Sequence, residues 1–97
     1  MISFEWDPVK AITNVRKHGI SFDEAYTAFL DENATLYFDI DHSDEEDRYI
    51  LLGFSSLSNL LVVVHCYLRD DTVIRIISAR KATNNEQQEY YNSIERR

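Results

Sequence analysis

The chain has 97 residues, 44% of them hydrophobic and 28% charged, with only two Gly and one Pro. This composition is that of one globular domain over residues 1–97 and excludes a disordered segment or a linker. The net charge of −7 excludes attraction to nucleic acid by the overall field of the protein. The single cysteine, the lack of a membrane-length apolar run and the lack of a signal-peptide pattern predict a soluble, cytoplasmic protein.

The charge is unevenly distributed along the chain. Residues 1–47 contain three Lys or Arg and twelve Asp or Glu, whereas residues 48–97 contain seven and five. The acidic half either serves solubility or pairs with a basic partner.

The first elements are a short strand over residues 4–6 and two helices. Asp7 is a good N-cap and Pro8 a good first helical residue, so a helix over 8–17 is expected, which Gly19 ends in the left-handed conformation. Ser21 and Glu24 form a capping-box pattern at the start of the second helix. An apolar stripe follows at helical spacing, made by Phe22, Ala25, Tyr26, Phe29 and Leu30.

Four strands and a helix follow, over residues 35–40, 48–54, 60–69, 72–80 and from Thr83 onward. The short connections predict an antiparallel meander, and Thr83 with Glu86 forms a second capping box. The fold class is therefore α+β, with the helices expected on one face of the sheet.

Alternation in the strand over 60–69 separates two faces. One face, expected to be the core, carries Leu60, Val62, Val64, Cys66 and Leu68. The other, expected to be the open surface, carries Leu61, Val63, His65, Tyr67 and Arg69. Cys66 is thus interpreted as a buried small hydrophobe and not as a nucleophile.

The basic strand over 72–81 places Arg75 and Arg80 on opposite faces by the same alternation. Each arginine either forms a salt bridge with the acidic half of the chain or offers a planar guanidinium to a phosphate. Both readings stay open from the residues alone.

The tract over 39–47 is rich in Asp and Glu and contains His42. It lacks the glycine of a calcium loop and the spacing of a zinc site, so a solvated acidic turn is the interpretation and no metal or cofactor is expected. Lys17 and His18 cap a helix end, and they also have the chemistry for proton transfer and charge stabilisation at an RNA phosphate.

Several stretches, in order over nearly the whole chain, resemble the BrnT family of toxins. The residues that carry the resemblance are Phe4-Glu5-Trp6-Asp7-Pro8, Lys10-Ala11, Asn14, Lys17-His18-Gly19-Ile20-Ser21-Phe22, Glu24-Ala25, Asp41-His42-Ser43, Arg48-Tyr49, Ile74 to Thr83, Glu86 and Tyr90.

The resemblance implies a RelE-like fold and a metal-independent endoribonuclease toxin of a bacterial type II toxin–antitoxin system. It implies a ribbon-helix-helix antitoxin, BrnA-like, as partner, RNA as substrate, and contact with operator DNA only through the antitoxin, without a membrane. It suggests as catalytic residues Lys17, His18, Arg69 and Arg80. Substrate-binding candidates are Arg48, Tyr49 and Arg75 from the motif, with His65 and Tyr67 added by strand alternation. Trp6 is interpreted as a packing residue.

Two features depart from the family pattern. Asp70-Asp71 stands where relatives commonly have a turn with glycine, and the chain is acidic. The alternative hypothesis is therefore an inactive binding module that acts with its antitoxin as a transcriptional corepressor. A third possibility is a structural domain whose arginines, Arg69, Arg75 and Arg80, are all in buried carboxylate pairs.

Overall fold

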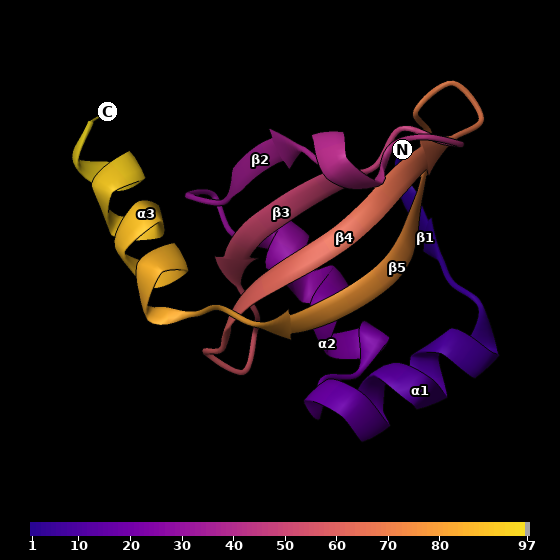
Figure 1. The fold of residues 1–97 in the computed structure, drawn as a ribbon, viewed down its shortest axis with the longest axis horizontal. Coiled ribbons are helices and arrows are strands. Elements are labelled where there is room, and N and C mark those ends of the chain that lie inside the picture. Colours follow the sequence, from indigo (N-terminus) through magenta and orange to yellow (C-terminus); the bar gives the residue numbers. More distant parts are fainter. Residues whose placement is uncertain (97) are drawn as a thin grey trace.

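The fold is a five-stranded sheet with helices on both faces, seen in a computed structural model that describes residues 1–96 (Figure 1). The strand order is β1-β5-β4-β3-β2. The elements are β1 (Ser3–Glu5), α1 (Pro8–His18), α2 (Phe22–Thr27), η1 (Ala28–Leu30), β2 (Thr35–Phe38), η2 (Ile40–His42), β3 (Tyr49–Phe54), β4 (Leu60–Leu68), β5 (Val73–Lys81) and α3 (Asn84–Glu95). The segments η1 and η2 are single 3-10 turns.

The predicted α+β class and the antiparallel meander of β2 to β5 are confirmed. β1 joins the sheet as a fifth strand, parallel to β5. β2 is shorter than predicted because the turn η2 begins at Ile40. None of the helices formed by residues 1–96 is long and apolar enough to cross a membrane.

The helix boundaries follow from local hydrogen bonds. Asp7 accepts from the Val9 N–H at 2.8 Å and starts α1, and Gly19 ends it with φ 71°. Thr83 and Glu86 form the predicted reciprocal capping box of α3. The box predicted at the start of α2 is only half formed: Ser21 accepts from the Glu24 N–H, but the Glu24 carboxylate accepts from two other side chains, Ser55 and Asn59.

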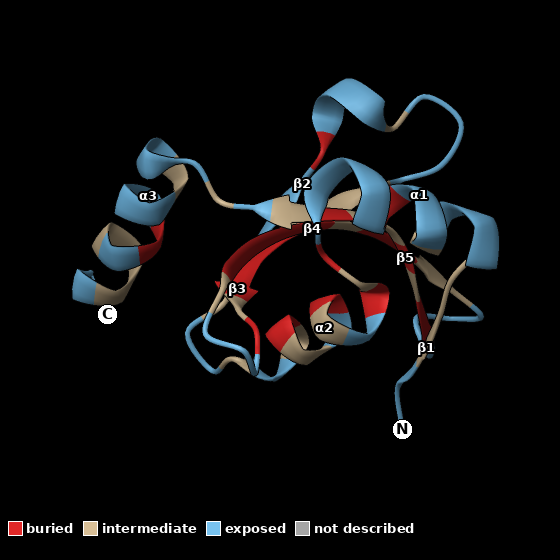
Figure 2. Ribbon diagram, turned by 90° about the horizontal axis from the view of Figure 1, so that it is seen from below, coloured by how far each residue is buried: buried red, intermediate tan, exposed pale blue. Residues whose placement is uncertain are grey.

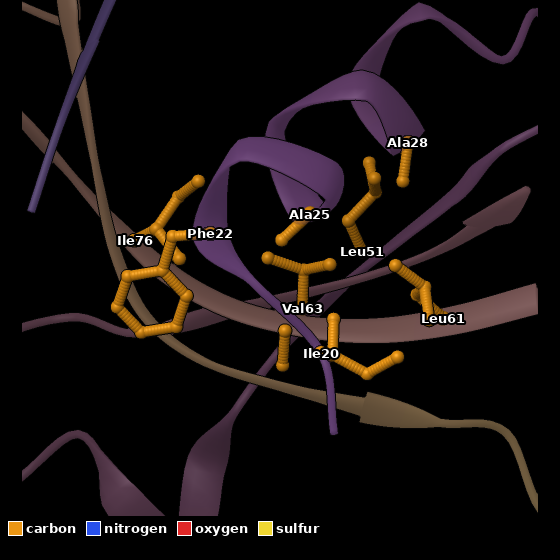
Figure 3. Packing of buried hydrophobic residues seen from close by; sticks show 9 residues of the cluster. Ile20, Phe22, Ala25, Ala28, Leu51, Leu61, Val63 and Ile76 are labelled. Carbon is orange, nitrogen blue, oxygen red and sulfur yellow. The ribbon is translucent and has the colours of Figure 1, made fainter. Parts of the chain in front are cut away.

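The main core lies between α2 and one face of the sheet, called here the α2 face. Figure 3 shows this cluster, in which Leu51 of β3, Leu61 and Val63 of β4, and Ile76 of β5 meet Ile20, Phe22, Ala25 and Ala28. Trp6 packs against this core with its ring centre 6.0 Å from that of Phe22, which confirms the packing interpretation.

A smaller cluster lies on the opposite face, called the α3 face. Leu52, Leu60 and Val62 meet Tyr90 of α3 there. The prediction that all helices cover one face is therefore wrong. The prediction that one face of β4 is open is also wrong. Leu61 and Val63, expected on that face, have no exposed surface, because α2 covers them. Figure 2 shows the buried residues concentrated along β3 and β4 between these layers.

Candidate functional site

β5 contains a bulge that changes which side chains share a face. Val64 pairs with Ser78, but the next residue of β4, His65, pairs with Ile76, so Ile77 is left without a partner. Beyond the bulge the alternation is reversed. Arg75 and Arg80 pair with Cys66 and Val62, two residues of the same side of β4, and both arginines therefore lie on the α3 face. The prediction that they point in opposite directions is wrong.

Arg48 precedes Tyr49, which pairs with His65 on the α2 face, and its carbonyl continues the β2–β3 ladder, so alternation places the Arg48 side chain on the α3 face. Burial and nearby Glu46 raise the pKa of the Cys66 thiol, and the charges of Arg75 and Arg48 act in the opposite direction. Cys66 is 2% exposed, which confirms its prediction as a buried hydrophobe. The α3 face thus carries three guanidinium groups beside buried apolar side chains. Arg48, Arg75 and Arg80 are called here the arginine row.

Each of the three arginines has a carboxylate neighbour. The N–O distances are 3.5 Å for Arg48–Glu46, 3.6 Å for Arg75–Glu5 and 2.7 Å for Arg80–Glu86. The first two pairs are long and solvated, so they stabilise the protein little and exchange readily for a phosphate. The Arg75 and Arg80 side chains are 41% and 42% exposed, so the buried pairs required by a purely structural role are not found.

A cavity of about 230 Å³ lies where α1 runs beside β5. Lys17 and His18 from the last turn of α1 line it, together with Lys10 from the first turn and Ser78 from β5. Two lysines, a histidine and two hydroxyl residues, Thr13 and Ser78, therefore surround one small hollow. Ser78 also connects this cavity to the arginine row, since it lies two residues before Arg80 in the same strand.

Asn14 fixes α1 in this position. β1 pairs only with Val73–Arg75, and the rest of that edge of β5 has no strand partner among residues 1–96. The Asn14 amide accepts from the Ala79 N–H at 3.1 Å and donates to the Ala79 carbonyl at 2.8 Å. It also donates to the Ile20 carbonyl at 2.9 Å. One buried amide thus completes the strand edge and determines where Lys17 and His18 lie.

The remaining candidates lie elsewhere. Tyr49, His65 and Tyr67 share the α2 face in an aromatic cluster, with the ring centres of Tyr49 and Tyr67 5.2 Å apart. His65 has no exposed surface, contrary to the expectation of an open face, and burial lowers its pKa. Its Nδ1 lies 3.1 Å from the Val63 carbonyl and its Nε2 3.3 Å from the Tyr67 hydroxyl.

Arg69 lies in the β4–β5 turn, at the opposite end of β5 from Arg80, with φ 51°. The structure therefore places Lys17 and His18 at one cavity and Arg48, Arg75 and Arg80 on one face of the sheet, and it separates both groups from Arg69 and from the aromatic cluster. Sequence reasoning missed Lys10, Asn14 and Ser78. The helical spacing of Lys10, Asn14 and Lys17 was the signal that could have identified one face of α1.

The α1–β5 cavity can carry out proton transfer beside a bound anion. An imidazole exchanges protons near neutral pH, and ammonium and guanidinium groups stabilise negative charge on phosphate oxygens. In residues 1–96 no three His, Cys, Asp or Glu side chains come together as a metal site would need.

The profile of the family described as "Ribonuclease toxin, BrnT, of type II toxin-antitoxin system" matches residues 6–86. A similar solved structure is the 1.1 Å crystal structure of the Brucella abortus ribonuclease toxin BrnT, with a TM-score of 0.67 and 24% identity. The match covers 87% of this chain and all of the Brucella chain, and at this identity it shows a shared fold. No curated protein matched the sequence. Because the family match extends from Trp6 through the capping box of α3, the chain belongs to the BrnT family of ribonuclease toxins of type II toxin–antitoxin systems.

Proposed function

We propose that this chain is a metal-independent endoribonuclease toxin that cleaves RNA in the cytoplasm and so arrests translation. The observation that carries the proposal is the α1–β5 cavity, in which Lys17 and His18 meet Ser78 beside the arginine row of the α3 face. A BrnA-like ribbon-helix-helix antitoxin would neutralise the activity.

The cleavage step uses the RNA's own 2′-hydroxyl. His18 takes the 2′-hydroxyl proton, the 2′-oxygen attacks the adjacent phosphorus, and the bond to the 5′-oxygen breaks. Lys17 donates a proton to the leaving 5′-oxygen, while Arg80 stabilises the charge that develops on the phosphorane and Arg75 binds a neighbouring phosphate. Arg69, at the far end of β5, would bind a phosphate several nucleotides further along the RNA strand.

The test is incubation of the purified protein with end-labelled RNA in the presence of EDTA, followed by mapping of the new ends. We expect discrete 5′-hydroxyl ends, and we expect His18→Ala to slow cleavage by at least about a hundredfold. The matched control is Arg16→Ala, which removes a cation from the same helical turn but does not line the cavity. Equal loss in both variants would contradict the site assignment.

The double hydrogen bond between Arg80 and Glu86 favours one competing function. It occupies the guanidinium that would otherwise hold RNA, as expected of a binding module that acts as corepressor with its antitoxin and contacts operator DNA only through it. Tight complex formation with the antitoxin and no new RNA ends at any protein concentration would support that function and refute the ribonuclease.

A further inference from the structure

The outer strand β2 has an open edge. β2 is the last strand in the sheet order, and within residues 1–96 it pairs only with β3 (Figure 1). Figure 1 shows the side of β2 away from β3 at the margin of the molecule. α3 contacts β2 from the α3 face, where Thr35 donates to Ser93 and Tyr37 donates to Glu89, both at 3.4 Å. An unpaired edge presents N–H and C=O groups that can accept a further strand.

The register identifies which backbone groups face outward. The Asp39 N–H donates to the Arg48 carbonyl at 2.8 Å, which marks this pair as hydrogen-bonded. Bonded and non-bonded pairs alternate in an antiparallel ladder, so Tyr37 also faces β3. The backbone groups of Leu36 and Phe38 therefore point away from the sheet.

The side chains of Leu36 and Phe38 are apolar and exposed. Leu36 is 50% and Phe38 48% exposed on the α2 face. Tyr37, between them, is 38% exposed on the α3 face. Soluble proteins protect an edge by keeping it short or by lysine, proline or a bulge. β2 is short, at four residues, but has no lysine, proline or bulge. An apolar edge without these residues indicates a surface that a partner covers.

The charge beside β2 identifies the partner's chemistry. Residues 39–47 follow the strand directly and contain six carboxylates and no Lys or Arg. Asp41, Asp44, Glu45 and Glu46 line a hollow of about 270 Å³ there, with His42 and Arg48. A strand added to β2 that continues past Phe38 passes this acidic segment. A second copy of the chain is disfavoured, because each copy carries a net charge of −7.

We propose that β2 accepts an extended, basic segment of a protein partner as a sixth strand, with the partner's apolar side chains on Leu36 and Phe38 and its cations beside residues 39–47. The recognition is β-augmentation, in which backbone hydrogen bonds supply affinity and alternate side chains supply specificity. The inference relies on the proposed function only in naming the antitoxin as the protein that supplies this strand.

The test uses a short capped peptide in which lysine alternates with valine, and the full-length protein labelled with ¹⁵N. We expect the amide hydrogens of Leu36 and Phe38 to exchange with solvent at least about tenfold more slowly with the peptide, because they become hydrogen-bonded. The control peptide alternates glutamate with valine and is expected not to bind. Binding without protection at these two amides, equal binding of the glutamate peptide, or no binding at about 1 mM would each overturn the proposal.

Two variants show whether a loss of peptide binding comes from the missing backbone N–H or from a misfolded protein. Leu36→Pro removes an outward N–H and is expected to weaken peptide binding at least about tenfold, while the β2–β3 ladder is retained. Leu36→Lys keeps the N–H and repels the basic peptide, so it weakens binding even if the proline variant does not fold. Unchanged affinity in Leu36→Lys would refute the docking edge. RNA cleavage without protection at β2 refutes only the docking edge, and protection without cleavage refutes only the ribonuclease.

Discussion

Arg80 and Glu86 connect β5 to the first turn of α3 through two parallel hydrogen bonds, Nη1 to Oε1 at 2.7 Å and Nη2 to Oε2 at 2.8 Å. Glu86 Oε1 also accepts from the Thr83 N–H at 2.8 Å. One carboxylate therefore caps α3 and holds a guanidinium. The hydrogen bonds from Arg80 and Thr83 lower the pKa of Glu86 to about 2 against the opposing effect of its burial.

The first prediction concerns Glu86→Gln, which keeps an oxygen for the Thr83 cap and loses the ion pair. The lowered pKa means that the pair stabilises the folded state above pH 4.5 and that this contribution disappears as the pH falls toward about 2. We expect the variant to lose about 1 kcal/mol at pH 7, a value discounted for solvent because Arg80 is 42% exposed.

Urea unfolding of both proteins between pH 7 and pH 2.5 measures this difference. Glu95→Gln, an exposed carboxylate at the other end of α3, is the control and should cost nothing. A difference between wild type and Glu86→Gln that stays constant over the whole pH range would contradict the ion-pair explanation.

The second prediction concerns Asn14→Ala. The substitution removes the partner of the Ala79 N–H and carbonyl in a site that is 5% exposed, so we expect a loss of about 2–4 kcal/mol in the free energy of unfolding. Chemical denaturation measures the loss, with Thr13→Ala on the same helix as the control. A cost below about 1 kcal/mol would mean that water replaces the amide at the β5 edge.

The third prediction concerns the β4–β5 turn, in which Arg69, Asp70 and Asp71 all have positive φ, at 51°, 56° and 65°. This conformation is sterically strained for a residue with a Cβ atom and is not strained for glycine. We expect Asp70→Gly to raise the free energy of unfolding by about 0.5–1 kcal/mol, with a higher Tm in calorimetry. A lower Tm would show that the Asp70 side chain stabilises the turn more than its backbone strain costs.

The fourth prediction concerns His65, whose pKa is lowered by burial. The unfolded chain then binds a proton more readily than the folded protein, so the contribution of neutral His65 is complete above pH 6.5 and is lost as the pH falls below it. We expect wild type to lose stability between pH 7 and pH 5, and His65→Phe to lose less over the same range. Parallel curves in denaturant titrations would assign the pH dependence to other groups.

Features set by neighbouring residues were predictable from the sequence. Asp7, Gly19 and Thr83 cap helices through hydrogen bonds that span only a few residues, so their residue types are sufficient to locate the helix boundaries. The short connections between strands likewise predicted the meander. The residue types of Lys17 and His18 suggested them as candidates, whereas Ser78, which lines the same cavity from β5, was not suggested.

Features set by contacts distant in sequence were not predictable in this way. Asn14 bonds to Ala79, 65 positions away, and nothing near Asn14 in the sequence indicates a strand edge that needs an amide. Alternation in β4 correctly separated its faces but could not tell which one α2 covers. The bulge at Ile77 has no glycine to mark it, so a simple count of alternate residues placed Arg75 on the wrong face.

The bulge also determines which side of the sheet the first half of β5 presents to α2. Ile77 is the extra residue, so Arg75 and Ile76 keep their faces only while Ile77 stays out of the ladder. If Ile77 took the position opposite His65, every side chain between Val73 and Ile76 would turn to the opposite side of the sheet. Arg75 would then enter the core beneath α2, while Ile76 would be expelled into water. Deletion of the codon for Ile77 would have the contrary effect, because the remaining residues keep their present partners and both arginines stay on the α3 face.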